Sequence, residues 1–411
     1  MAAQTDRPGE PFDPFDPFEL SDTIQAGVAD DPYPLLAAAR RQSSVQRESP
    51  LGDAASVVAG EKPTFYALGY DEVVTVLRDS ETYSSSILGE ALGPLLGRTM
   101  VAMDDPEHRA HRALVAPAFR PRLLAQWEQS LVQRVVDEQI DGFASLGRTD
   151  LVRTLTFTVP VRVIAHILGL PESDIARFQR WSLEVVSFPT NWERGFAAYE
   201  ALREYFAEQV AERRARPRED LITELVEAEI DGTSLTDEDI FAFLKLLLPA
   251  GIETTYRSMG NLLFGLLTHP DQLEEAKRDL RLRENAIEEG LRWQPPFISL
   301  ERKCIRDTRL GGVDIPAGSV VSVFIGSANH DERRFPDPER FDIHRNAIAH
   351  VTFGAGAHTC LGMHLARLES KVALNTLLNR LPGIRLDTAA PAPHIIGTTF
   401  RSPDSLPVRF D

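Results

Sequence analysis

Residues 350–369, HVTFGAGAHTCLGMHLARLE, place one of the two cysteines of the chain between a run of small residues and an amphipathic segment. Gly354 and Gly356 precede Cys360, and Gly362 follows it. The segment beyond Gly362 has the apolar spacing of a helix, so a glycine-rich turn delivers the cysteine to a helix start. Free N–H groups and the helix dipole stabilise negative charge there, which favours a thiolate. The alternative is a buried cysteine with only a packing role.

The wider pattern, Phe353-Gly354-x-Gly356-x-His358-x-Cys360-x-Gly362, resembles the haem-binding loop of cytochrome P450 enzymes. The resemblance implies that Cys360 is the axial thiolate ligand of haem b, where it pushes electron density onto the iron and favours O–O cleavage. It also implies that Gly354 and Gly362 contact the haem and that His358 reaches a propionate. Phe353 would lie against the sulfur, and plain core packing is compatible with that role.

The stretch DDPEHRAHR, at residues 104–112, carries strong signals for a helix start. Asp105 can cap the helix and Pro106 suits its first turn, which places His108 and Arg112 on one face. A solvated surface would explain this pair without any ligand. The stretch resembles the haem-flanking helix of P450 enzymes, in which the matching histidine and arginine bind propionates. Arg302 matches a strand arginine with the same role in that family.

Residues 241–267, FAFLKLLLPAGIETTYRSMGNLLFGLL, predict one long apolar helix. Pro249 removes a backbone donor in its middle, and the Glu-Thr-Thr group that follows brings a carboxylate and hydroxyls into an apolar face. We expect a broken helix at this point. Polar exceptions of this kind tend to mark functional sites, and a kink with capped polar groups is the alternative.

Ala250-Gly251-x-Glu253-Thr254 resembles the oxygen-binding motif of P450 enzymes, with glutamate where many bacterial members carry aspartate. The resemblance implies that Thr254 stabilises the oxygen species on the iron and that Glu253 relays protons. Ala250 and Gly251 have small side chains and would leave room between the helix and the haem.

Glu289 and Arg292 are three residues apart in a predicted helix, a spacing that many exposed helices contain. Here the pair lies between the Glu-Thr-Thr helix and the cysteine loop, as the fold-locking ion pair of P450 enzymes does. An arginine in FPDPERF completes that network in the family. We therefore expect Glu289, Arg292 and Arg340 to form a structural ion-pair network.

Residues 84–100, SSSILGEALGPLLGRTM, are apolar but interrupted by glycine and proline, and predict a loop with at most one short helical turn. The matching stretch of P450 enzymes covers the substrate pocket. Each substrate-contact candidate could instead pack in the core. These candidates are Leu88, Leu92, Leu246, Leu247, Phe297, Ile298, Thr399 and Phe400, together with Ile87, Leu95, Phe188 and Trp192.

Composition bounds the remaining choices. A net charge of −17 disfavours binding to nucleic acid or to an anionic membrane, and no stretch of about 18 apolar residues occurs. Two cysteines suggest no disulfide framework, so we expect a cytoplasmic protein in which Cys304 is a small structural residue. The Pro-Phe-Asp repeat predicts an extended arm over residues 1–20. Residues 21–411 would form one catalytic domain, with no fused reductase.

The resemblance implies a mainly α fold with a smaller β region, the triangular helical prism of P450 enzymes around a buried haem. It implies a monomeric haem-thiolate monooxygenase that inserts one atom of O2 into a terpene, steroid, fatty or aromatic molecule. Electrons would come from a separate ferredoxin and its reductase. The ferredoxin would dock on the Cys360 side, at a basic patch of Arg109, Arg112, Arg367 and Lys371. The alternatives are a peroxygenase driven by H2O2 and a non-catalytic haem-binding or sensor protein.

Overall fold

The computed structural model describes residues 31–52, 59–60, 62–186, 191–230 and 232–411. The arm predicted for residues 1–20 lies outside these ranges. The helices of the described part are α2 (Tyr33–Gln42), α3 (Tyr70–Arg78), α4 (Ser86–Leu96), α5 (Glu107–Val115), α6 (Pro121–Trp127), α7 (Gln133–Ala144), α8 (Thr158–Ile167), α9 (Ile175–Val186), α10 (Trp192–Ala215), α11 (Leu221–Glu227), α12 (Asp237–Thr268), α13 (Pro270–Arg278), α14 (Leu280–Trp293), α15 (Ile325–Asn329) and α16 (Met363–Arg380).

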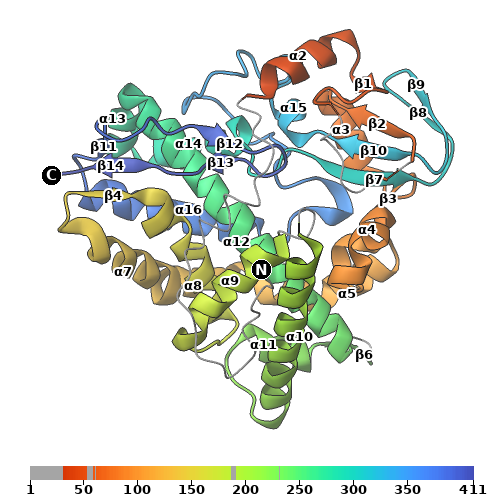
Figure 1. Cartoon of the computed structure of the whole chain (residues 1–411), viewed down its shortest axis with the longest axis horizontal. Helices are drawn as coiled ribbons and strands as arrows, with labels where there is room; N and C mark the ends of the chain where they lie inside the picture. The colour runs from red at the N-terminus through yellow and green to blue at the C-terminus, as the bar shows by residue number, and fades with distance from the viewer. Residues whose placement is uncertain (1–30, 53–58, 61, 187–190, 231) are drawn as a thin grey trace.

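The strands are much shorter than the helices, so most of the regular structure is helical, which confirms the predicted fold class of a mainly α protein with a smaller β region. They are β1 (Val45–Gln46), β2 (Thr64–Ala67), β3 (Tyr83–Ser84), β4 (Arg148–Asp150), β5 (Glu229–Ile230), β6 (Thr233–Ser234), β7 (Leu300–Cys304), β8 (Thr308–Leu310), β9 (Val313–Ile315), β10 (Val320–Val323), β11 (Arg385–Leu386), β12 (Ile395–Ile396), β13 (Ser402–Pro403) and β14 (Pro407–Arg409). Figure 1 shows a roughly triangular molecule with the largest sheet in one corner.

Helix α12 crosses the middle of the molecule (Figure 1) and packs against α8, α10, α14 and α16. It begins at a capping box, in which the Thr236 hydroxyl and the Asp239 carboxylate each accept a backbone N–H of the other residue. The helix runs without interruption from Asp237 to Thr268, with Pro249 inside it. The prediction of a broken helix is therefore wrong, because packing on several sides holds the turn around the proline in helical form.

Helix α4 replaces the loop that was predicted for residues 84–100. Ile87 is fully buried in a cluster with Ala59 and Val320, so it packs in the core and is not a substrate contact. Burial of this apolar face outweighs the weak helix propensity of the glycines and the proline. Gly97, at φ 67°, ends the helix in a conformation that favours glycine.

The largest sheet has the strand order β1-β2-β10-β7-β3, with β10 parallel to β2 and antiparallel to β7. Strand β7 carries both Arg302 and Cys304. Cys304 is fully buried and its thiol donates to the carbonyl oxygen of Arg306, in keeping with the structural role predicted for it. Within the described ranges, no helix is long and apolar enough to cross a membrane.

Candidate functional site

The cysteine loop is held by two glycines with positive φ, Gly354 at 71° and Gly356 at 74°. A Cβ on Gly356 would lie 2.7 Å from the carbonyl oxygen of Leu77, so only glycine fits there. The backbone N–H of Cys360 donates to the carbonyl oxygen of Phe353 at 2.8 Å, which closes the turn just before α16 begins at Met363. The loop therefore fixes where the sulfur lies.

The Cys360 side chain is exposed to a space that the surrounding protein largely encloses, because burial raises the pKa of the same thiol. Backbone N–H groups of Gly362 and Met363 act in the opposite direction and lower that pKa. Burial is the larger effect, so the expectation that the helix start alone favours a thiolate is wrong for the uncoordinated sulfur.

Basic side chains from three elements meet beside this loop. The His108 ring, on α5, lies 4.0 Å from the His358 ring, centroid to centroid. Arg112 donates to the carbonyl oxygen of Thr359 at 2.7 Å, and Nε2 of His358 shares a hydrogen bond with Ser85 Oγ at 3.1 Å. Arg302, on β7, is near enough to His358 to lower the pKa of that ring.

Positively charged neighbours and burial both disfavour the charged forms of this cluster. Burial and the nearby Arg302, His108 and Arg112 lower the pKa of His358 to about 3. Burial lowers the pKa of Arg302 to about 10, although Asp104 and Glu301 act in the opposite direction. Nε2 of His108 is buried with no hydrogen-bond partner among the described residues. Such a site is built to receive anionic groups from outside the chain.

Helix α12 presents its small residues on one side. Ala250 is exposed and Gly251 and Thr254 are partly exposed, whereas Ile252 and Glu253 are each 1% exposed. The Thr254 hydroxyl donates to the carbonyl oxygen of Ala250 at 2.7 Å. An exposed strip on a helix in the middle of the molecule borders an internal space, as a bound group beside α12 would require.

Glu253 points to a different partner. Its Oε2 atom accepts from Nε of Arg257 at 3.1 Å, one helical turn along α12, and both side chains are buried. Its Oε1 atom is buried with no hydrogen-bond partner among the described residues. Glu253 and Thr254, the predicted acid and alcohol, therefore have different hydrogen-bond partners: Arg257 for Glu253 and the Ala250 carbonyl oxygen for Thr254.

The Glu289–Arg292 ion pair is present and fully buried, with two hydrogen bonds of 2.7 Å between the side chains. The third member of the network is Arg345, whose Nε donates to Glu289 Oε1 at 3.2 Å. The prediction of Arg340 is wrong, because this residue offers only its carbonyl oxygen, to Arg292 and Arg345. The chain turns after Phe341, and the turn brings the later arginine to the carboxylate.

Comparison with known proteins decides the family. A model of the family described as "Cytochrome P450" matches residues 178–382. Cytochrome P450 monooxygenase PikC of Streptomyces venezuelae is 36% identical over 88% of this chain and 86% of its own, and erythromycin C-12 hydroxylase of Saccharopolyspora erythraea is 38% identical over 79% and 83%. The crystal structure of CYP109E1 from Bacillus megaterium in complex with testosterone superposes with a TM-score of 0.83, at 32% identity, over 93% of this chain and 99% of that one.

The chain belongs to the cytochrome P450 family. It is an enzyme of the monooxygenase class, and membership implies a haem cofactor. The residues present fit that group. An exposed thiol faces an interior space, small residues of α12 border such a space, and basic side chains with spare hydrogen-bonding capacity match the two propionates of a haem.

The substrate-contact candidates of this P450 differ in burial. Leu88, Leu246 and Leu247 are partly buried on α4 and α12, and the Phe297 and Phe400 rings contact each other with centroids 5.0 Å apart. Thr399 is exposed. Ile298 is 1% exposed and lies against Gly326, so this candidate is wrong, because alternation along an extended segment points it away from Phe297. The side chains of Leu92 and Leu95, and all of Phe188, lie outside what the structure describes. Trp192 stacks on Phe196, and both rings are exposed.

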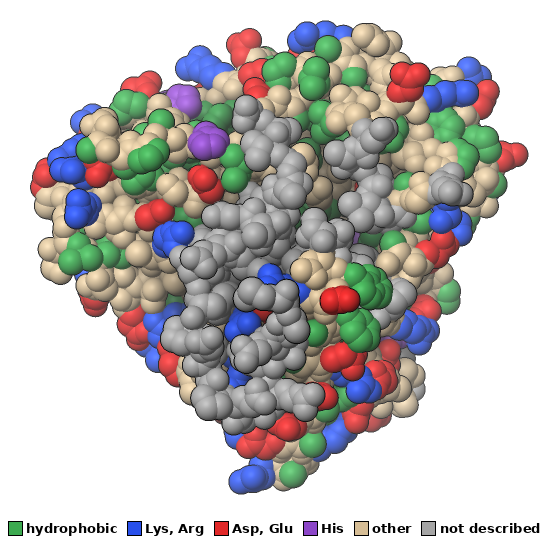
Figure 2. Space-filling view, viewed as in Figure 1, with side chains coloured by type: hydrophobic (Ala, Val, Ile, Leu, Met, Phe, Trp, Pro, Cys, Tyr) green, Lys and Arg blue, Asp and Glu red, His purple; other side chains and the backbone are tan. Residues whose placement is uncertain are grey.

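Three of the four residues in the basic patch predicted on the Cys360 side of the P450 form ion pairs with neighbouring carboxylates. Arg109 pairs with Asp105, Arg367 with Glu288 and Lys371 with Glu128, at 2.6 to 2.8 Å. Arg112 is engaged with the cysteine loop. On the face in Figure 2, acidic and basic side chains are likewise interspersed.

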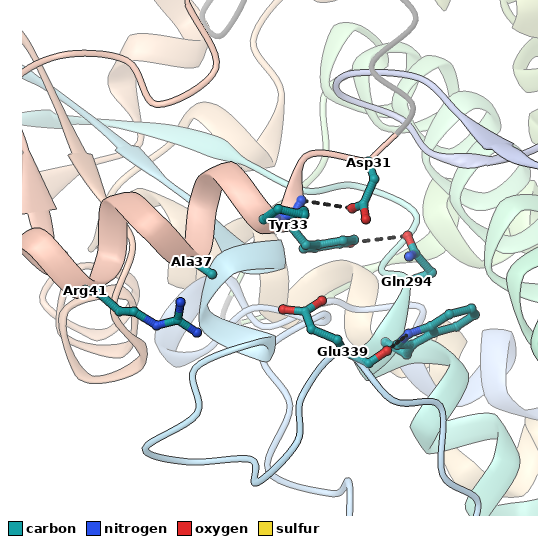
Figure 3. Close-up of a pocket in the computed structure, with 8 residues that line it drawn as sticks. Asp31, Tyr33, Ala37, Arg41, Gln294 and Glu339 are labelled. Atoms are coloured by element: carbon teal, nitrogen blue, oxygen red, sulfur yellow. Dashed lines mark hydrogen bonds between the residues drawn. The ribbon is translucent and has the colours of Figure 1, made fainter.

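A separate surface pocket of about 350 Å³ lies between α2 and the end of α14 (Figure 3). Its polar groups already have partners in the protein. Asp31 accepts the backbone N–H of Tyr33, the Tyr33 hydroxyl donates to Gln294, and Glu339 pairs with His330. This pocket is distinct from the Cys360 site, and we assign it no ligand.

Three residues of the site were missed by sequence reasoning. Ser85 and Arg345 contact their partners across long sequence separations, and no local pattern indicates either contact. Arg257 could have been found, because an arginine four residues after a glutamate on a predicted helix forms a common ion pair.

Proposed function

We propose that this P450 binds haem b through the Cys360 thiolate and inserts one oxygen atom from O2 into an apolar small molecule, with electrons from a ferredoxin and its reductase. The observation that carries the proposal is the meeting of the Cys360 thiol with the basic cluster at an interior space. When bound, the haem supplies the activation of O2, which no amino-acid side chain provides.

The chain's own residues would hold that group by charge and shape. His108, Arg112, Arg302 and His358 would donate hydrogen bonds to the propionates, which would relieve the electrostatic repulsion among these side chains. Phe353, Gly354 and Gly362 would shape the surface beside the sulfur. The Arg367 guanidinium lies 4.5 Å from the centre of the Phe353 ring and would keep that ring in place.

Thr254 and Glu253 would manage protons on the opposite side. The Thr254 hydroxyl is anchored at the Ala250 carbonyl oxygen and can rotate to offer its proton toward the space beside α12. Glu253 would replace that proton through Oε1, the oxygen that Arg257 leaves free. Ala250 would keep bulky side-chain atoms out of that space, whereas Gly251 leaves room for Ile164 of α8, which a Cβ would approach to 3.1 Å.

The substrate class follows from the lining. Leu88, Leu246, Leu247, Phe297 and Phe400 offer apolar surface, and Leu92 and Thr399 remain candidates from the sequence. One relative is named for hydroxylation of erythromycin, and a structural neighbour was solved with testosterone bound. These names support a bulky, largely apolar molecule in the terpene, steroid, fatty or aromatic range. Docking of the ferredoxin on the Cys360 side, the monomeric state and the cytoplasmic location stay predictions.

The test uses the purified haem-loaded protein. A compound panel is screened for the shift of the haem band from low spin to high spin, which reports that a ligand has displaced water from the iron. A compound that shifts the band is then incubated with NADH, a ferredoxin, its reductase and O2. Oxygenated product that carries one atom of labelled O2 supports the proposal, and Cys360→Ser should abolish both the thiolate-type reduced-CO spectrum and the product.

Two results would overturn the proposal in different ways. Product formed with H2O2 and none with O2 and electrons would indicate a peroxygenase. Spin shifts without product under either condition would indicate a haem-binding or sensor protein.

A further inference from the structure

The side of α12 that carries Glu253 is also the side that holds the late hairpin of the chain. Glu253, Arg257 and Asn261 are spaced four residues apart and form one stripe along the helix. All three are buried, at 1%, 2% and 0% exposure. The stripe faces the segment Ile395–Pro403, which we call the pocket hairpin, because Gly260 beside the stripe would place a Cβ 3.5 Å from Pro403.

Arg257 contacts both sides of this interface. Its Nε donates to Glu253 Oε2 at 3.1 Å, and its terminal nitrogen Nη1 donates to the hydroxyl of Ser402 at 3.0 Å. The guanidinium also lies 5.7 Å from the centre of the Phe400 ring and 4.8 Å from that of Tyr256. A planar guanidinium that is fixed at several points transmits a shift of one partner to the others.

The far end of the pocket hairpin belongs to the candidate substrate site. Phe400 pairs with Phe297 through an isolated β-bridge as well as through their rings, and the backbone N–H of Ile298 donates to the carbonyl oxygen of Thr399 at 3.1 Å. A molecule that contacts Phe297 would therefore also press against the pocket hairpin. Because Ser402 of that hairpin binds Arg257, the displacement would reach Arg257 as well.

We propose that Arg257 is a positioning residue that couples the pocket hairpin to Glu253, so that occupancy of the substrate site changes how the proton-relaying acid is held. The proposal rests on the function proposed above for Glu253 and the pocket. Arg257 acts through the carboxylate that it holds and the hydroxyl that it binds.

The coupling predicts that a change at Glu253 alters the pocket hairpin on the other side of Arg257. A contact confined to Glu253 and Arg257 would not produce this effect. Glu253→Gln weakens the grip on Arg257 and should speed hydrogen exchange of the amides in residues 397–403 by about three- to tenfold, although Glu253 does not itself contact the hairpin. Ser402→Ala should speed the same amides to a similar degree. The double variant should exchange no faster than the faster single variant, because both changes release the same guanidinium.

Exchange is measured by mass spectrometry on the haem-loaded protein without any added ligand, so this readout does not depend on turnover. The matched control is Ser258→Ala, which removes a buried hydroxyl that donates only to the Thr255 carbonyl oxygen on the same helix. Unchanged exchange of the hairpin in the Glu253→Gln variant, or effects of the two substitutions that multiply in the double variant, would overturn the coupling.

A second measurement connects the coupling to catalysis. Ser402→Ala should lower the product formed per NADH consumed by about threefold and leave H2O2-driven product unchanged, because peroxide brings its own protons. A wild-type protein that forms no product overturns the proposed function and leaves the exchange result to decide the coupling. Wild-type turnover with equal yields per NADH in Ser402→Ala and Ser258→Ala would overturn the catalytic consequence of the coupling.

Discussion

Two buried glutamate–arginine pairs, one on α14 and one on α12, differ in how completely the carboxylate is satisfied. Both oxygens of Glu289 are engaged, by the Arg292 guanidinium, by Arg345 and by the backbone N–H of Asp342. Glu253 uses one oxygen for Arg257, and its other oxygen is buried with no hydrogen-bond partner in the described part of the chain. The saturated pair fits the predicted scaffold role, and the unpaired oxygen of the second pair fits the proton-relaying role that we propose for Glu253.

A third buried glutamate extends the comparison. Glu369, on α16, is 1% exposed, and its Oε2 atom has no hydrogen-bond partner among the described residues. Burial alone raises the pKa of this carboxyl to about 8. The three residues therefore form a series in which the buried acid is compensated by two arginines and a backbone N–H, by one arginine, or by no cation among the described residues.

The largest effect is expected at the saturated pair. Glu289→Gln removes the charge that compensates Arg292 and leaves a buried guanidinium unpaired, so we expect a loss of about 3–5 kcal/mol in the free energy of unfolding. Urea unfolding followed by circular dichroism at pH 7 measures it. A loss of under about 1 kcal/mol, the usual range for an exposed ion pair, would remove the scaffold role.

The next effect is the pH dependence that Glu369 imposes. Its pKa is higher in the folded protein, about 8, than the ordinary 4.5, so the folded state holds a proton that the unfolded state loses. The stability from this group is fully present below about pH 4.5 and is lost as the pH rises to about 8. Glu369→Gln should therefore be more stable than the wild type by about 4 kcal/mol at pH 8, relative to the difference at pH 4.5.

Urea unfolding across this pH range checks the Glu369 prediction. Glu284→Gln on α14, where the wild-type side chain is exposed, is the matched control and should leave the profile unchanged. Parallel wild-type and Glu369→Gln profiles between pH 4.5 and 8 would show that the carboxyl is ionised in the folded protein.

The third prediction concerns Glu253, the carboxylate with an unpaired oxygen, and its effect on kcat. Glu253→Gln cannot pass a proton, so with O2 and electrons we expect kcat to fall by about 100-fold, equivalent to about 2.7 kcal/mol. Turnover with H2O2 should change by less than about threefold, because peroxide needs no relay. Equal losses with both oxidants would mean that the carboxylate is structural, like Glu289.

The sequence predicted the features that depend on residues close together in the chain. It missed those that depend on contacts between residues far apart in the chain. Cys360, its glycines and the Glu289–Arg292 spacing are local patterns, and the loop and the ion pair lie where these patterns placed them. The helix over residues 86–96 was missed because glycine and proline argue against it locally and a distant contact of Ile87 with Val320 decides it.

The same reasoning explains the errors in the site. Ile298 faces the core because of its neighbours across the chain, and the pKa of the Cys360 thiol is set by burial that a helix-start argument does not include. The choice of Arg340 over Arg345 rested on a motif position, and the backbone turn after Phe341 settles which guanidinium reaches Glu289.

The smallest predicted effect concerns Arg345 and Arg340, and it tests how many donors the Glu289 carboxylate needs. Arg345→Gln removes one hydrogen bond to a carboxylate that Arg292 already neutralises, so we expect a loss of about 1–2 kcal/mol in the free energy of unfolding. Arg340→Gln keeps the carbonyl oxygen that Arg292 uses and should cost less than about 0.5 kcal/mol. Urea unfolding of the two variants side by side gives the ranking. The reverse order would return Arg340 to the network, and equal small losses would mean that Glu289 is satisfied by Arg292 and the backbone alone.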